Sequence, residues 1–228
     1  DGIKCVVVSA DKVYNEFSSG TPDATAYRRF MKMLYDKSSN KNNAPKNLCL
    51  FGDGIWDNRM VTSSFGGATP DDYLLCYESD NSVSHTDSYI LEEYFSLLDD
   101  NDGKRVASDR PDCGVGRIPV KTEAEAKAVV NKLIPYIYNK EAGPWRNTIC
   151  MMADDGNANI HMSDAESITS IVRETAPDMR IRKIYWDSYS REQTATGNSY
   201  PATYDDINRQ MEDGALVMNY TGHGAAYC

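Results

Sequence analysis

A histidine between two glycines is the residue of this chain best suited to chemistry. His223 stands in the motif Thr-Gly-His-Gly at 221–224, directly after the apolar run 215–220. Glycine on each side allows positive φ and the close approach of a substrate carbonyl. The imidazole could then act as a base, and the N–H of Gly224 could donate to an oxyanion. The alternative interpretation is a histidine in an ordinary turn.

Acidic residues follow two other apolar runs in the same way. Asp53 follows the run 47–51, and Asp154 and Asp155 follow the run 148–152. Ligands of open parallel sheets bind at the carboxyl ends of the strands. We therefore predict that Asp53, Asp155 and His223 lie at one edge of one sheet. Plain strand-terminating turns are the alternative, since Gly and Asp favour turns.

The cysteines are widely spaced and include no Cys-x-x-Cys pair. Cys5, Cys49 and Cys150 each lie in an apolar run, so we expect them to be reduced and buried. Structural zinc sites bring paired ligands at short spacing, so the sequence predicts no metal site.

Strands and helices alternate along the chain. We predict strands at 3–9, 47–51, 94–98, 115–118, 148–152, 181–185 and 215–220, and helices at 21–37, 122–139, 163–175 and 204–213. Thr122 and Glu125 form a capping-box pattern at the start of the second helix. The alternation indicates an α/β fold, a mostly parallel sheet with helices on both faces. A Gly-Pro-Trp segment at 143–145 favours two halves, 1–143 and 144–228.

Composition excludes several classes of function. The chain has 228 residues and a net charge of −10, with 34 acidic against 24 basic residues. This balance argues against nucleic acid and anionic membranes, which need clustered Lys and Arg. No apolar run approaches the roughly 20 residues of a membrane span. No signal peptide is visible, so we expect an excised piece of a longer protein.

Eight short motifs occur in order along nearly the whole chain, and they make the sequence recognisable. They lie at 17–23, 50–54, 71–73, 93–100, 114–120, 145–147, 153–156 and 219–224. In this order they resemble the gingipain-type cysteine peptidases, a caspase-like family, and within it the sortase-like member of the type IX secretion system. The most specific motif is Asn-Tyr-Thr-Gly-His-Gly at 219–224.

The resemblance implies a caspase/gingipain-like fold in two similar halves and a His–Cys dyad. His223 would be the catalytic histidine, and the Gly224 N–H would serve the oxyanion hole. Asp155, or its neighbour Asp154, would orient the imidazole. His161, Asp154 and Asp53 are the candidates for substrate binding.

The family places its nucleophilic cysteine after an alanine at the end of the next strand. No Ala-Cys pair occurs here, so we expect the nucleophile beyond residue 228 and an inactive fragment. Cys228 lies only five residues after His223. If Cys228 is the true terminus, its own carboxylate would raise the thiol pKa, which disfavours it as the nucleophile.

The resemblance also implies partners and a location. The substrate would be a polypeptide, the partners other type IX secretion components, and the location the extracellular or outer-membrane surface of a Gram-negative bacterium. No cofactor is required, although acidic clusters at 71–72 and 99–103 allow a structural calcium ion. The alternatives are a pseudo-peptidase and a flavodoxin-like binding module, which the lack of a Gly-rich phosphate loop disfavours.

Overall fold

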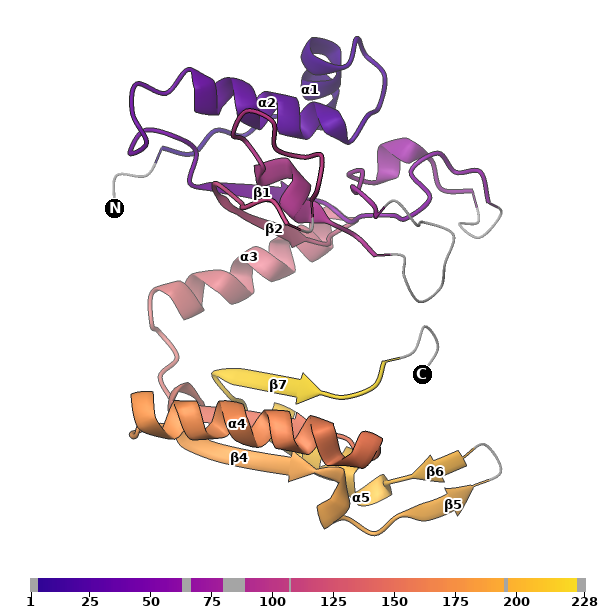
Figure 1. Ribbon diagram of the computed structural model, residues 1–228, viewed down its shortest axis with the longest axis vertical. Coiled ribbons are helices and arrows are strands. Elements are labelled where there is room, and N and C mark those ends of the chain that lie inside the picture. The colour runs from indigo at the N-terminus through magenta and orange to yellow at the C-terminus, as the bar shows by residue number, and fades with distance from the viewer. Residues whose placement is uncertain (1–3, 63–66, 80–88, 107, 195–196, 225–228) are drawn as a thin grey trace. The chain divides into compact units, whose positions relative to one another are not determined.

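The structure is a computed structural model that describes residues 4–62, 67–79, 89–106, 108–194 and 197–224. The chain forms two compact units, residues 1–133 and 134–228 (Figure 1). Its strands are mostly parallel and alternate with helices, so the predicted α/β class is confirmed. Within the described residues, no helix combines the length and the apolar character that a membrane crossing needs.

The first unit packs two helices against a parallel pair of strands. Its elements are α1 (Ala10–Phe17), α2 (Thr25–Asp36), β1 (Asn47–Phe51), the 3-10 helices Pro70–Asp72 and Glu92–Ser96, β2 (Gly114–Ile118) and most of α3 (Glu123–Ile137). β1 and β2 run in register from Asn47 opposite Gly114 to Phe51 opposite Ile118. The core is rich in aromatic side chains, with Tyr14, Tyr27 and Phe95 buried together.

Arg117 on β2 fixes the chain where it leaves β1. Its guanidinium forms a mostly buried ion pair with Glu92, whose carboxylate accepts from Nε at 2.8 Å and also from Nη2. It also donates to the carbonyl oxygens of Gly52, Leu74 and Leu75. These contacts join β2 to two loops, so the turn after β1 is held by the fold of this unit.

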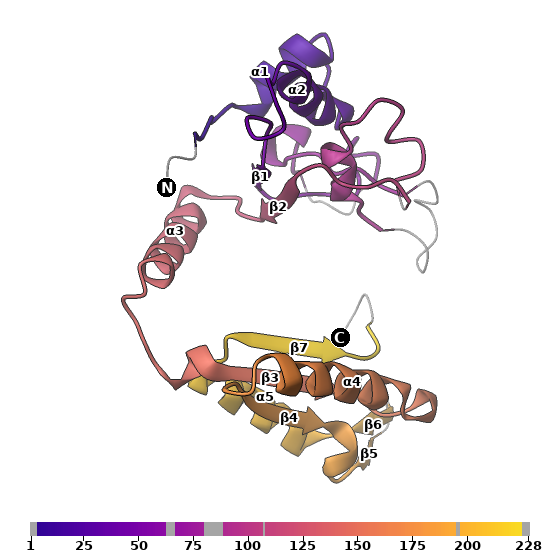
Figure 2. The same ribbon diagram turned by 60° about the vertical axis from the view of Figure 1, so that its left-hand side comes forward.

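The second unit is a three-stranded parallel sheet with helical connections (Figures 1 and 2). Its elements are β3 (Thr148–Ala153), α4 (Ile160–Thr175), β4 (Arg180–Tyr185), the antiparallel pair β5 (Glu192–Thr194) and β6 (Gly197–Ser199), α5 (Pro201–Asp213) and β7 (Val217–Thr221), with 3-10 helices Pro144–Asn147, Asn157–Asn159 and Trp186–Ser188. The strand order is β4-β3-β7. β3 therefore lies in the centre, with Cys150 and Ala153 completely buried.

Two ion pairs from β4 show that the sheet is covered on both faces. Lys183 pairs with Glu166 on α4, whereas its neighbour Arg182 pairs with Asp206 on α5 at 2.6 Å. Successive side chains of a strand point to opposite faces. α4 and α5 therefore cover opposite faces, as right-handed crossovers require when the chain reverses direction across the sheet, and Figure 1 shows α4 in front of the sheet.

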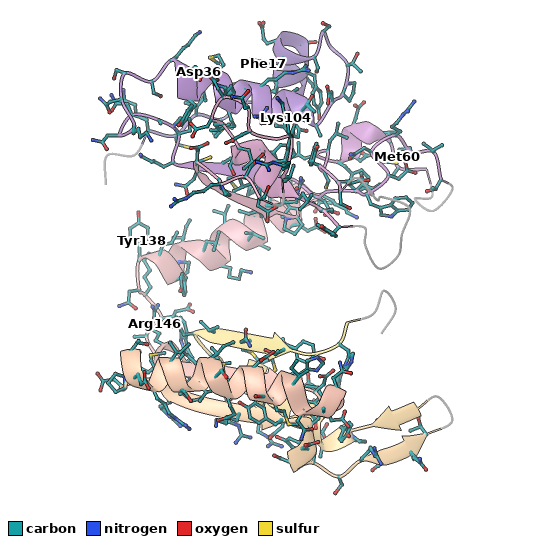
Figure 3. All side chains as sticks on the ribbon, viewed as in Figure 1. Phe17, Asp36, Met60, Lys104, Tyr138 and Arg146 are labelled. Atoms are coloured by element: carbon teal, nitrogen blue, oxygen red, sulfur yellow. The ribbon has the colours of Figure 1, made fainter. Side chains whose placement is uncertain are left out.

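The end of α3 is tied to the segment 143–147 by stacked side chains. The rings of Tyr136 and Trp145 stack at 5.9 Å between centroids, and the guanidinium of Arg146, a residue labelled in Figure 3, lies over both rings. The second compact unit accordingly begins at Ile134, and the Gly-Pro-Trp segment lies inside it. The assignment of 1–143 and 144–228 as two halves of a peptidase stays a prediction.

Most predicted elements are present, but two strands are wrong. Within the described residues 4–9 there is no strand, and the chain enters α1 at Ala10 instead. The predicted strand 94–98 overlaps the 3-10 helix Glu92–Ser96. The first predicted helix begins at Thr25 rather than near Thr21, because the Asp23 carboxylate accepts from the N–H and the hydroxyl of Thr25.

The cysteine prediction is confirmed for one residue of three. Cys150 is buried in β3, whereas Cys5 and Cys49 are exposed free thiols. Cys5 lies outside any strand. Cys49 lies on β1, where side chains alternate and Leu50 is the residue turned into the core.

Candidate active site

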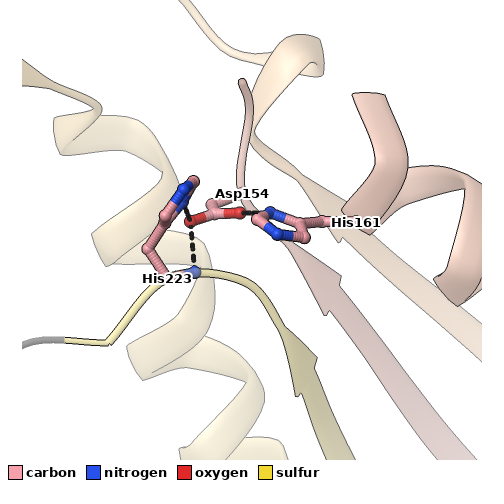
Figure 4. A group of neighbouring side chains, drawn as sticks. All are labelled: Asp154, His161 and His223. Carbon is pink, nitrogen blue, oxygen red and sulfur yellow. Dashed lines mark hydrogen bonds and ion pairs between the residues drawn. The ribbon is translucent and has the colours of Figure 1, made fainter. Parts of the chain in front are cut away.

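Three polar side chains converge where two neighbouring strands of the second unit end. Asp154 follows β3, and His223 follows β7 after a single glycine. The register pairs Ala153 with Thr221, so these two strands end side by side. His161, near the start of α4, completes the group (Figure 4).

The carboxylate of Asp154 holds the imidazole of His223 in one orientation. The Asp154 Oδ2 atom lies 2.7 Å from Nδ1 of His223 and also accepts the His223 backbone N–H at 2.8 Å. The hydroxyl of Tyr220 donates to the same oxygen at 3.1 Å. An ionised carboxylate only accepts hydrogen bonds, so Nδ1 carries the proton and Nε2 presents its lone pair.

His161 binds the other oxygen of the same carboxylate. Its Nδ1 atom lies 2.5 Å from Oδ1 of Asp154, and its ring meets the ring of His223 edge-on at 4.7 Å between centroids. The side chains of Asp154 and His161 are 11% and 15% exposed, whereas that of His223 is 59% exposed. The carboxylate is thus enclosed between two imidazoles, and only His223 is open to solvent.

The environment keeps Asp154 ionised. Burial raises the pKa of its carboxyl, but hydrogen bonds from His223, His161 and Tyr220 outweigh burial and lower the pKa to about 2. A permanent negative charge at Nδ1 is what an imidazolium formed during proton transfer needs for stabilisation.

Two glycines flank His223 and serve different purposes. A Cβ on Gly222 would lie 2.4 Å from the Tyr220 hydroxyl and 2.7 Å from Cγ of Asp154, so only glycine fits there. A Cβ on Gly224 would meet no atom within 4 Å. Among the described residues, no acceptor is hydrogen-bonded to the Gly224 N–H.

The side chain of Asn157 contacts the free nitrogen of His223. Its Nδ2 atom lies 3.0 Å from Nε2. Asn157 belongs to a run of four residues with positive φ, which starts at Gly156 and ends at Asn159. The sequence analysis missed Asn157. The Gly-Asn-Ala-Asn sequence was the available signal, because Asn tolerates the left-handed conformation.

The structure brings Asp154, rather than Asp155, to the imidazole. The Asp155 carboxylate instead accepts from the hydroxyl of Tyr200 at 2.5 Å. Side chains alternate along the extended chain that leaves β3, so neighbouring aspartates point in different directions. The preference for Asp155 as the orienting residue is therefore corrected to its neighbour.

Asp53 belongs to the first unit. It follows β1, which pairs with β2 in that unit, and its common sheet edge with His223 stays a prediction. Its carboxylate accepts from the Gly54 N–H and pairs with Lys121 at 3.0 Å. The substrate-binding roles assigned to Asp53, Asp154 and His161 stay predictions.

One of the acidic clusters has the donor chemistry of a calcium site. Carboxylate oxygens of Asp99, Asp102 and Asp112 lie within 4.8 Å of one another. Oxygen ligands suit Ca²⁺, so this cluster fits a structural calcium ion. In the cluster at 71–72, the carboxylate of Asp72 accepts from the N–H and hydroxyl of Thr69.

Comparison with known proteins adds one match. The model of peptidase family C25 matches residues 1–227 of the chain. The comparisons with curated proteins and with solved structures found no match. The family match includes both compact units and the group around His223.

Proposed function

The chain belongs to peptidase family C25, the gingipain family of cysteine peptidases, and we propose that it forms most of the catalytic domain of a sortase-like endopeptidase. This enzyme removes a carboxy-terminal sorting domain from secreted cargo. The peptidase assignment rests on the family, which also implies a polypeptide substrate. The sortase-like specificity is supported by the resemblance of the ordered motifs, above all Asn-Tyr-Thr-Gly-His-Gly at 219–224.

One observation carries the catalytic proposal: the imidazole of His223 is held at Nδ1 by a buried carboxylate, while most of its side chain is exposed to solvent. A nucleophile is usually activated by a neighbouring base, and a third group that accepts a hydrogen bond from the base holds it in the right orientation. Asp154 would supply that support and would stabilise the imidazolium.

The reaction would begin when Nε2 of His223 takes the proton of a cysteine thiol. Asn157 must first release Nε2. The thiolate then attacks the peptide carbonyl carbon, and the oxyanion of the tetrahedral intermediate accepts from the Gly224 N–H. As the intermediate collapses, His223 returns the proton to the leaving amine, and an acyl-enzyme forms. Water or an amine resolves it.

The nucleophile of this proposal lies in the parent protein after residue 228. Cys150 is unsuited to the role, because it is completely buried in β3 and burial raises its thiol pKa. Cys228 lies outside the described residues. The family pattern, with an Ala-Cys at the end of a following strand, supports the placement.

The same resemblance supports the remaining parts of the proposal. The parent protein would act at the extracellular or outer-membrane surface of a Gram-negative bacterium, together with other type IX secretion components. Asp99, Asp102 and Asp112 would hold a structural calcium ion. The family leaves little support for a flavodoxin-like binding module, and a pseudo-peptidase is one outcome of the test below.

The test compares two variants of the full-length parent protein. His223→Ala should lower the rate of cargo cleavage by at least about 10²–10⁴-fold, because the general base is lost. Cys228→Ser should leave cleavage nearly unchanged, because the thiol is supplied from elsewhere. Removal of the sorting domain is followed by mass spectrometry, and folding by circular dichroism.

Each variant can contradict a different part of the proposal. A folded His223→Ala protein with normal turnover would contradict the peptidase mechanism. A dead Cys228→Ser protein would move the nucleophile into this chain. A parent protein that cleaves general peptides but removes no sorting domain would support the peptidase activity and contradict the sortase-like specificity.

A further inference from the structure

Asp154, His161 and His223 offer a set of ligand atoms that catalysis alone does not require. One carboxylate oxygen and one nitrogen from each imidazole can be chosen so that all lie within 4.8 Å of one another. Two imidazoles with one carboxylate are a preferred ligand set for zinc and its neighbours in the first transition row. The group lies wholly within the second unit, so its geometry depends on β3, α4 and β7 alone.

We propose that Asp154, His161 and His223 form a binding site for a zinc-type divalent cation, and that the bound cation silences the peptidase. The proposal goes beyond the peptidase function, because a His–Cys dyad needs no metal. It also differs from the calcium cluster of the first unit, which contains oxygen ligands only.

The distances leave room for a metal after a small movement. The Nδ1 atoms of His161 and His223 lie 2.5 and 2.7 Å from the two oxygens of Asp154. Ligands of a tetrahedral zinc ion, at bonds of about 2.0–2.1 Å, lie roughly 3.3 Å apart. Each imidazole therefore has to move away from the oxygen it now contacts by less than about 1 Å, and ligand atoms that lie up to 4.8 Å apart have to close by up to about 1.5 Å. The exposed ring of His223 gives the cation access from solvent.

Binding would change which nitrogen of His223 carries the proton. A neutral imidazole that binds the metal through Nδ1 has its single proton on Nε2, so no net proton is released. Nε2 then has no lone pair for a cysteine thiol, and His223 stops acting as a base. The contact with Nδ2 of Asn157 is also lost, since both atoms would then be donors.

The experiment titrates the 228-residue chain with Co²⁺, after its accessible thiols have been blocked with iodoacetamide. Visible absorption reports four-coordinate Co²⁺, and Zn²⁺ should displace the cobalt and abolish the band. His161→Ala should weaken the affinity at least about tenfold, because second-shell losses alone reach 10–100-fold. The matched control is Asp102→Asn in the oxygen-only cluster, which should leave the cobalt affinity unchanged.

A second measurement keeps the proposal testable if His161→Ala fails to fold. In the wild-type chain, the ring-nitrogen NMR signals of His161 and His223 should shift on zinc addition. A missing cobalt band, unchanged affinity in folded His161→Ala, or unshifted ring signals would each overturn the metal site. None of these results bears on the peptidase function, which is measured on the metal-free parent protein.

Discussion

At the scale of single residues, Gly222 decides whether Asp154 can reach His223. We expect Gly222→Ala to abolish most of the parent's peptidase activity, because the added Cβ would lie 2.4 Å from the Tyr220 hydroxyl and 2.7 Å from Asp154. The side chains of Tyr220 and Asp154 would then have to move, and these are the groups that orient the imidazole of His223. Cleavage rates measure the loss. Gly116→Ala is the control, because its Cβ would meet no atom. Equal activity in the two variants would contradict the geometry.

Asn157 should shield the reactive nitrogen of His223. Asn157→Ala removes the contact at Nε2, and a typical net hydrogen bond changes an equilibrium about two- to tenfold. Diethyl pyrocarbonate, which modifies unprotonated imidazole nitrogens, should therefore react with His223 faster by about that factor. Mass spectrometry of the peptides gives the rate, and His161 in the same sample is the internal reference. An unchanged ratio would show that the contact does not limit access.

The sequence indicated part of the site and missed the rest for specific reasons. His223 was found because a Gly-His-Gly motif at a strand end is unusual, and its place beside Asp154 followed from parallel strands. The choice between Asp154 and Asp155 depended on the direction of two neighbouring side chains, which the motif leaves open. Asn157 reaches His223 from 66 residues away, and no local pattern reports such a contact.

At the scale of elements, the capping box of α3 gives a test that depends on pH. Thr122 and Glu125 exchange hydrogen bonds between side chains and backbone N–H groups, as predicted from their spacing. The N–H groups of Lys121 and Thr122 lower the pKa of the Glu125 carboxyl below its ordinary value of 4.5. A lowered pKa means that the stabilisation is complete above about pH 4.5 and is lost as the pH falls through the folded-state value.

Glu125→Gln should therefore destabilise the chain at neutral pH and much less in acid. Thr122→Ala should cost about 0.5–2 kcal/mol at neutral pH, the usual effect of losing an N-cap. Urea unfolding between pH 7 and pH 3 measures both variants against the wild type. If the loss of unfolding free energy in Glu125→Gln grew as the pH fell, the result would contradict the capping role of the ionised Glu125 carboxylate.

Helices and strands were predictable where one local sequence pattern dominated. They were not predictable where a contact with a distant residue determined the conformation. β3 and β7 are apolar strands bounded by Gly and Asp, and both were found. The segment 92–96 contains Tyr and Phe, which favour a strand, yet it forms a 3-10 helix whose Glu92 pairs with Arg117. α1 was missed because just two of its side chains, Val13 and Tyr14, are buried.

At the scale of the whole molecule, the two units have separate cores, and their cysteines can report on each. Cys5 and Cys49 are exposed and should react with a thiol reagent in the native chain. The other described cysteines, Cys76, Cys113 and Cys150, are buried, and burial raises the pKa of each thiol. These three should stay unmodified until unfolding.

Unfolding should expose these buried thiols in two steps. Cys76 and Cys113 belong to the first unit and Cys150 to the second, and each unit has its own buried cluster. Pulse labelling across a urea series should thus give one midpoint for the first pair and a different one for Cys150. A single shared midpoint would mean that the units unfold as one body.

The four hydrogen bonds that meet at Asp154 have a consequence for mutational tolerance. Asn has nearly the same shape but would offer a donor where two imidazoles and a backbone N–H also donate. Glu would place its carboxylate about one bond further into a space that already excludes a Cβ at Gly222. In a saturation library scored for folding rather than for activity, position 154 should accept fewer amino acids than either histidine it joins. Variation in substrate preference would then arise more easily in the surrounding loops than in this carboxylate.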